Sequence, residues 1–184
     1  MRFQGGVLSL MFVLQANFSA AAATTTYYMG DYLQTSPGGT TQKSLMFLQK
    51  TYDPDRGLAI ERGIQVNADD SVSDSTITFT ITGNNFTVSD TSGKMNGKGT
   101  FTGTPWGWTF FKATYNFPSL NLRVDDENTL ADPSVVTGRK TVYVNGQIVQ
   151  VIDTTLKQIT ESSFQLLTGP IIKNAQNEKK YKKD

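Results

Sequence analysis

The chain has 184 residues, of which 38% are hydrophobic, 18% charged and 11% aromatic, a balance typical of one globular domain. It contains neither histidine nor cysteine, which excludes Ser-His-Asp and Cys-His nucleophilic sites, His- or Cys-ligated metal sites, disulfides and redox thiols. The net charge is +1, but without Arg2 and residues 173–184 the body carries 11 basic and 14 acidic residues, which argues against a nucleic-acid-binding protein.

The first 23 residues have the three-part layout of a secretory signal peptide. Arg2 precedes a short apolar run at 7–14, and small residues follow as far as Ala23. The apolar run is far shorter than the roughly 20 residues that cross a bilayer as a helix. We therefore expect cleavage near Ala22 or Ala23 and a mature form without a transmembrane segment. The lack of cysteine favours a periplasmic or secreted bacterial protein over a disulfide-rich animal module.

The rest of the chain is predicted to form about ten β-strands, each bounded by Gly, Pro, Asn or Asp. The clearest is 76–82, where apolar residues and threonines alternate, so that Ile77, Phe79 and Ile81 share one face. Asn145-Gly146 is a strong hairpin signal between the last two strands. The predicted strands are 30–35, 44–53, 58–66, 76–82, 86–89, 94–103, 106–117, 120–128, 138–145 and 147–157.

One short helix is predicted after the strands, over 160–167, with Thr160 as its N-cap and Gly169-Pro170 as its stop. The predicted organisation is a signal peptide at 1–23, a β-domain at 24–172 and a basic flexible tail at 173–184.

These elements predict an all-β fold, a single antiparallel up-and-down barrel of about ten strands with a short C-terminal helix. A two-sheet sandwich is the alternative, but closure removes the exposed edge strands and the near-meander order favours a barrel. An outer-membrane barrel fits poorly, because the strands expose many Thr, Ser and Asn residues and the chain ends in a charged tail.

Several segments between residues 95 and 168 resemble uncharacterised exported bacterial proteins with lipocalin-like (calycin) β-barrels. The resemblance implies a lipocalin-like barrel, a fold that carriers, pigment binders and enzymes share. The opening Gly-x-Trp signature of lipocalins is not matched, since Gly30-Asp31-Tyr32 is only a loose analogue. The segments are Gly103-Thr104-Pro105-Trp106-Gly107-Trp108, Arg123-Val124-Asp125-Asp126-Glu127-Asn128, Gly138-Arg139-Lys140 and Ile152-Asp153-Thr154-Thr155-Leu156-Lys157.

Strand alternation predicts an internal polar cluster of Arg62, Asp126 and Lys140, since each lies in register with the apolar residues of its strand. Charges that face the interior are expected to pair with one another or with a ligand, because an unpaired buried charge is costly. The alternative is that Asp126 and Lys140 lie at wet strand ends and that Arg62 extends to solvent.

Aromatic residues complete the predicted ligand site. Trp106 and Trp108 fall on one face of 106–117 and could close a barrel mouth, although tryptophans in β-proteins are more often part of the core. Tyr143 is added because 139–143 approximates the Arg-x-Tyr pattern of fatty-acid binders.

The sequence therefore predicts an exported barrel, a monomer or small homo-oligomer, that binds a small apolar or amphipathic molecule in its interior, with Arg62, Asp126 and Lys140 at the polar end. No catalytic residue, metal ligand or cofactor is predicted. Two alternatives stay open: a histidine-free isomerase or lyase using Asp126, Glu61, Tyr or Arg, and a ligand-free structural envelope protein with a filled barrel. Arg123, Asp125 and Glu127 are expected to form a solvated salt-bridge row.

Overall fold

The computed structural model describes residues 22–90, 92–104, 107–132 and 134–181. Most of the predicted signal peptide, Trp106 and the last three residues of the predicted tail lie outside these ranges. No helix in the described part of the chain has the length and apolar character needed to cross a membrane.

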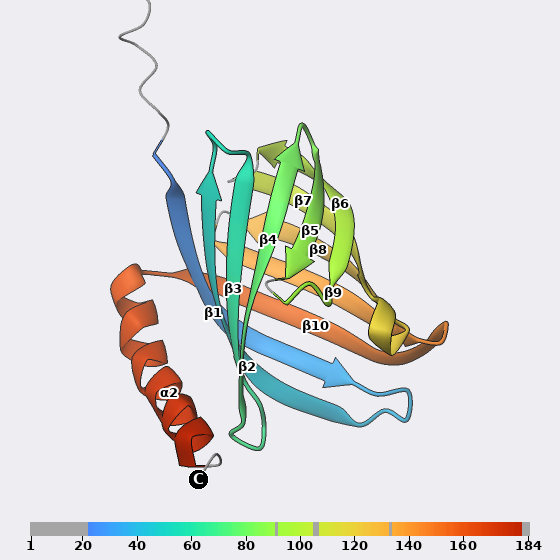
Figure 1. Cartoon of the computed structure of the whole chain (residues 1–184), viewed down its shortest axis with the longest axis vertical. Coiled ribbons are helices and arrows are strands. Elements are labelled where there is room, and N and C mark those ends of the chain that lie inside the picture. The colour runs from blue at the N-terminus through green and yellow to red at the C-terminus, as the bar shows by residue number, and fades with distance from the viewer. Residues whose placement is uncertain (1–21, 91, 105–106, 133, 182–184) are drawn as a thin grey trace, which may run out of the picture.

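Within the described residues the chain forms a closed barrel of ten antiparallel strands, as predicted (Figure 1). Neighbouring strands follow chain order, and β1 closes the barrel by pairing with both β2 and β10. A 3-10 turn, η1 (Pro118–Leu120), joins β7 to β8. The strands are β1 (Thr24–Thr35), β2 (Thr41–Asp53), β3 (Leu58–Val66), β4 (Val72–Thr82), β5 (Asn85–Asp90), β6 (Asn96–Thr104), β7 (Gly107–Phe117), β8 (Leu122–Asp132), β9 (Val135–Val144) and β10 (Gln147–Ile159).

The hairpin predicted at Asn145-Gly146 is confirmed. Both residues have positive φ, 52° and 80°, and Val144 pairs with Gln147 directly across the turn. Such a two-residue turn matches the right-handed twist of the strands that it joins, and asparagine and glycine tolerate its backbone angles better than other residues. This turn fixes the register of β9 against β10.

Aromatic side chains fill one side of the barrel interior. The predicted inward face of β4 is confirmed, with Phe79 buried and Ile77 and Ile81 packed against the same core. Phe79 meets Phe86 at 5.4 Å between ring centroids, and Phe86 stacks on Phe111 at 4.8 Å. Most of this core comes from strands β4 to β7, and Tyr52 of β2 and Ala59 of β3 also belong to it.

A β-bulge in β7 overturns the alternation predicted for 106–117. Thr102 pairs with Phe110 while Gly103 pairs with Trp108, so Thr109 has no partner on β6. An extra residue in one strand shifts its alternation by one position. Strict alternation would place Trp108 and Phe111 on opposite faces, but because of the bulge both point inward, with their rings 5.7 Å apart.

Helix α2 (Glu161–Tyr181) lies outside the barrel, beside β1 (Figure 1). The N-cap predicted at Thr160 is confirmed, since its hydroxyl accepts a hydrogen bond from the backbone N–H of Ser163 at 3.2 Å. The stop predicted at Gly169-Pro170 is wrong, because the helix continues through Pro170 into the segment predicted as a tail. A proline inside a helix removes the hydrogen bond to the carbonyl four residues earlier, and its ring crowds that carbonyl. The residue in question, Leu166, is 77% exposed, so this turn faces water.

The helix covers an apolar patch on the outer wall of the barrel. Phe164 packs against Phe47 and Ile64, and all three side chains are almost completely buried. The ring of Phe164 lies 5.0 Å from that of Tyr27 and 6.3 Å from that of Phe47. The outward side chains under the helix are therefore buried as deeply as those of the barrel interior.

Candidate functional site

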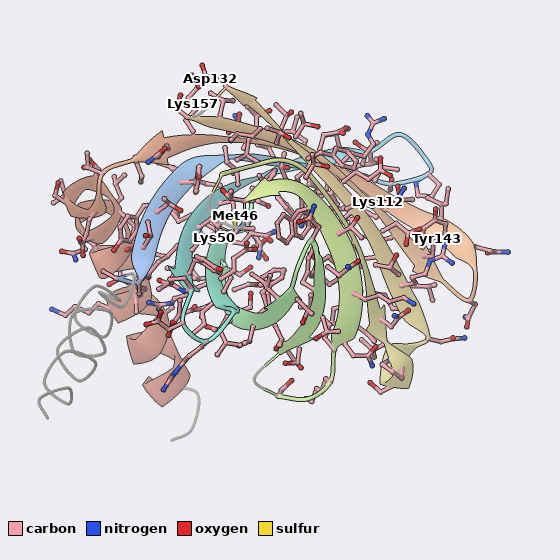
Figure 2. All side chains as sticks on the ribbon, turned by 90° about the horizontal axis from the view of Figure 1, so that it is seen from above. Met46, Lys50, Lys112, Asp132, Tyr143 and Lys157 are labelled. Atoms are coloured by element: carbon pink, nitrogen blue, oxygen red, sulfur yellow. The ribbon has the colours of Figure 1, made fainter. Side chains whose placement is uncertain are left out.

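An interior cavity of about 330 Å³ lies on the side of the barrel that the aromatic core leaves open. Strands from all around the barrel except β5 and β6 contribute inward side chains to its wall. Figure 2, which looks down the barrel, shows Met46 and Lys50 inside it and Tyr143 at its outer edge. The apolar part of the wall includes Met46, Leu48, Ile77, Trp108, Phe111 and Val142, and the polar part includes Tyr28, Tyr32, Lys50, Glu61, Asp126, Asn128 and Lys140.

Asp126 is the centre of the polar part and is only 2% exposed. Its Oδ2 accepts hydrogen bonds from the Lys140 ammonium at 2.8 Å and from the Tyr115 hydroxyl at 3.3 Å. Its Oδ1 accepts a third from the Asn128 amide at 2.8 Å. Both oxygens are thus satisfied by donors on three neighbouring strands, which is what a buried carboxylate requires.

The backbone explains why these groups meet. Asp126 and Lys140 are directly opposite each other in the β8–β9 ladder, where Cβ atoms come within about 5 Å. Gly138 gives Asn128 its space, because a Cβ at that position would overlap the Asn128 amide oxygen. The pair of charges and the third donor are therefore positioned by strand register.

Burial and charge together set the protonation of this cluster. Burial alone would lower the pKa of Lys140, but the charge and hydrogen bond of Asp126, together with Tyr32 and Glu61, outweigh burial, so the pKa of Lys140 lies above its ordinary value. Burial, and then the charge of Asp126, raise the pKa of Tyr115 well above 10. Burial also raises the pKa of Tyr32, with Lys140 acting against it and Asp126 and Glu61 reinforcing it. At neutral pH the lysine is charged and both tyrosines are neutral hydroxyls.

A second ion pair lies on the wall formed by β2 and β3. Lys50 and Glu61 are direct cross-strand partners, with 3.5 Å between the ammonium nitrogen and the nearest carboxylate oxygen. Their side chains are 17% and 22% exposed. The Lys50 ammonium also lies 5.1 Å from the centre of the Trp108 ring, within the range of a cation–π interaction. This pair connects the polar part of the cavity to its aromatic wall.

Three of the predicted site residues come together in the cavity: Asp126, Lys140 and Trp108. The inward orientation of Asp126 and Lys140 follows the alternation that the sequence shows, while Trp108 reaches the cavity because of the bulge. Ligand binding by these three residues stays a prediction. Trp106 lies outside the described residues.

The inward orientation predicted for Arg62 is wrong. Arg62 lies on the outer surface, where its guanidinium donates two hydrogen bonds to Asp74 at 3.0 and 2.7 Å. The neighbouring inward residues of β3 are Glu61 and Gly63, which line the cavity. The physical reason is that the apolar residues in register with Arg62, above all Ile64, are buried under helix α2 and not inside the barrel.

Tyr143 also faces outward and is absent from the cavity wall. Its ring stacks under the Arg123 guanidinium at 4.1 Å. On β9 the side chains that face the cavity are those of Lys140 and Val142, which are two positions apart, and Tyr143 directly follows Val142. The salt-bridge row predicted for Arg123, Asp125 and Glu127 is confirmed in part: Arg123 and Asp125 are joined at 3.2 Å on the surface, whereas Glu127 pairs with Lys112 of β7.

Four residues of the cavity wall are not among the predicted site residues: Tyr32, Lys50, Tyr115 and Asn128. Two of them carry a readable signal, since Lys50 alternates with the apolar residues of its strand and Asn128 continues the face of Asp126. The sequence offers Glu61 only as a candidate group of the enzyme alternative. Alternation along one strand does not predict its ion pair with Lys50, because that prediction also requires the register of the β2–β3 hairpin.

The arrangement offers a ligand an apolar wall and two charged pairs with neutral hydroxyls between them. In the described part of the chain no group of three or more acidic side chains is placed to hold a metal ion. The lining side chains can offer a small guest hydrogen bonds, electrostatic contacts and apolar surface.

Comparison with known proteins supports the fold assignment. No family model matches the chain, and no curated protein matches it. Among solved structures, the S-type phycobiliprotein lyase CPES from Guillardia theta superposes with a TM-score of 0.55 at 6% identity, over 80% of this chain and 92% of that one. A putative AttH from Nitrosomonas europaea matches with a TM-score of 0.29 at 10% identity, over 73% of this chain and 50% of that one. The class that fold and cavity define is a lipocalin-like barrel with a polar cluster inside.

Proposed function

We propose that this protein is an exported binding protein that holds a small hydrophobic or amphipathic molecule inside its barrel. The observation that carries the proposal is the cavity of about 330 Å³, which is at the lower end of the size of small-molecule sites. Its wall combines apolar and aromatic side chains with a few fixed polar groups, the usual composition of such sites. A purely structural barrel would fill this space with its own side chains.

The hydrogen bonds of Asp126 argue against this carboxylate as the acid or base of the enzyme alternative. A general acid or base has to exchange protons with a substrate. Asp126 instead accepts three hydrogen bonds from protein donors and is 2% exposed. The fold similarity to the S-type phycobiliprotein lyase adds no reaction to this chain, because at 6% identity it concerns architecture only.

Export is part of the proposal and rests on the sequence of residues 1–23. Strand β1 begins at Thr24, so cleavage near Ala22 or Ala23 would leave all ten strands of the described barrel intact. Intact mass and N-terminal sequencing of the protein from the extracytoplasmic fraction of its host test this step. A full-length mass in the cytoplasmic fraction would refute it.

Native mass spectrometry of the mature protein purified from its own host tests the binding function. We expect a stoichiometric small molecule that can be extracted and identified. The variant Gly63→Phe should abolish its retention, because Gly63 lines the cavity and an added Cβ would meet nothing closer than 3.7 Å, so a larger side chain can enter the cavity. Ile60→Phe is the matched control, since Ile60 is on the same strand, faces outward and is 45% exposed.

The outcomes separate the hypotheses clearly. Loss of the ligand in Gly63→Phe but not in Ile60→Phe supports interior binding. A clean apo mass for the wild type, together with no thermal shift across a panel of lipids and metabolites, would refute it. Equal retention by both variants would place the bound molecule elsewhere on the protein.

A further inference from the structure

The charges that line the cavity are balanced. Four of the described lining residues carry a formal charge, Lys50 and Lys140 as cations and Glu61 and Asp126 as anions, so the wall has no net charge. Each cation has an anion as its direct cross-strand partner, at 3.5 Å for Lys50–Glu61 and 2.8 Å for Lys140–Asp126. The four side chains are between 3% and 25% exposed, so water screens them weakly.

The hydrogen-bonding capacity left for a guest is unequal among these groups. Asp126 already accepts from Lys140, Tyr115 and Asn128. Lys140 has three N–H bonds and uses one of them in its contact with Asp126. Glu61 has Lys50 as its described ion partner, at a distance longer than a normal charged hydrogen bond. The cavity therefore presents a donor at Lys140 and an acceptor at Glu61.

A guest with a net charge would disturb this balance. A carboxylate approaching Lys140 also approaches Asp126, and an ammonium approaching Glu61 also approaches Lys50, because each target is paired with the opposite charge. The guest would lose its hydration and leave one uncompensated charge in a weakly screened space. An uncharged group that both accepts and donates hydrogen bonds avoids this cost.

We infer that the ligand has a head group without net charge that both accepts and donates hydrogen bonds, such as a primary amide or a hydroxyl, attached to an apolar body. Lys140 donates to the head group, Glu61 accepts from it, and the apolar body lies against Trp108 and the aliphatic wall. This inference rests on the proposed function, since it names the ligand class of the same cavity.

Three ten-carbon probes whose head groups are neutral, anionic and cationic at pH 7.5 test the inference: decanamide, decanoate and decylamine. Isothermal titration calorimetry at pH 7.5 on the mature wild-type protein should give a Kd for decanamide at least tenfold below the other two. Glu61→Gln leaves the cavity with a net charge of +1 and should lower the Kd of decanoate relative to decanamide by tenfold or more. Lys50→Gln leaves it at −1 and should do the same for decylamine.

Arg62→Gln is the matched control, because Arg62 is adjacent to Glu61 in sequence but binds Asp74 on the outer surface. It should leave the order of the three probes unchanged, and circular dichroism and thermal unfolding check that each variant is folded. Gly63→Phe, with the cavity filled, serves as the non-binding reference.

Two results overturn the inference while the proposed function stands: a wild-type preference for decanoate or decylamine, or a probe order that neither Glu61→Gln nor Lys50→Gln alters. If none of the three probes binds the wild type better than Gly63→Phe, interior binding itself fails for ligands of this size, and the inference fails with it.

Discussion

Removing the charge of Lys140 is the sharpest test of how the interior cluster is built. Lys140→Met keeps most of the side-chain length but leaves the Asp126 carboxylate, 3% exposed, without its cation. Breaking a buried pair in this way costs about 3–5 kcal/mol. Asp126 keeps the Tyr115 and Asn128 donors, so we expect a loss near the lower limit, about 3 kcal/mol.

The neighbouring surface pair provides the control. Arg139 lies next to Lys140 on β9 and bonds Asp153 at 2.7 Å, but these side chains are 68% and 47% exposed. Solvent screening reduces such a pair to about 0–1 kcal/mol, so Arg139→Met should cost less than about 1 kcal/mol. The double variant Lys140→Met with Asp126→Asn should recover part of the loss, because no unpaired buried charge remains.

Urea unfolding at pH 7, followed by far-ultraviolet circular dichroism, measures these differences, provided that the dependence on urea concentration is the same for all variants. Equal losses for Lys140→Met and Arg139→Met would refute the view that the interior pair is poorly screened. A double variant less stable than Lys140→Met would show that packing, and not charge, dominates the effect.

Three further predictions concern pH, the helix and the close strand contacts. Because burial raises the pKa of Tyr115, the stability that this residue contributes is complete below the unfolded pKa of about 10 and is lost as the pH rises towards the folded pKa. Urea unfolding between pH 8 and 11 should therefore show a decline in the free energy of unfolding that is less steep in Tyr115→Phe, and an equally steep decline in this variant would contradict the prediction. Phe164→Ala should lower the free energy of unfolding in urea by about 3–5 kcal/mol, because this ring packs α2 against the barrel, whereas Leu166→Ala on the exposed side of the helix should lower it by less than about 0.5 kcal/mol. Similar losses for the two variants would show that this contact does not hold the helix. Gly99→Ala should severely lower the yield of folded protein, because the added Cβ would overlap a strand carbonyl and a core phenylalanine ring. Gly63→Ala is the control, since a Cβ at that position meets no atom closer than 3.7 Å, and equal thermal stability of the two variants would refute the prediction.

The sequence by itself determined the strands, the turns and one face of several strands. Alternation of threonine with Ile77, Phe79 and Ile81 requires an extended chain with one apolar side, and Asn145-Gly146 requires a tight turn. The same reasoning placed Asp126 and Lys140 among inward residues. These features are local, since they depend on residues two positions apart or adjacent in the chain.

Only the tertiary structure decided which apolar face was the interior and which charges met. Helix α2 buries Ile64 on the outside of the barrel, so Arg62, which alternation with Ile64 predicts to face inward, faces outward, and Glu61 faces the cavity. The bulge at Thr109 brought Trp108 to the cavity, which no alternation rule predicts. The pairing of Lys50 with Glu61 required the β2–β3 register. Each of these features depends on how separate segments pack and pair with one another. The residues within a single segment do not determine this.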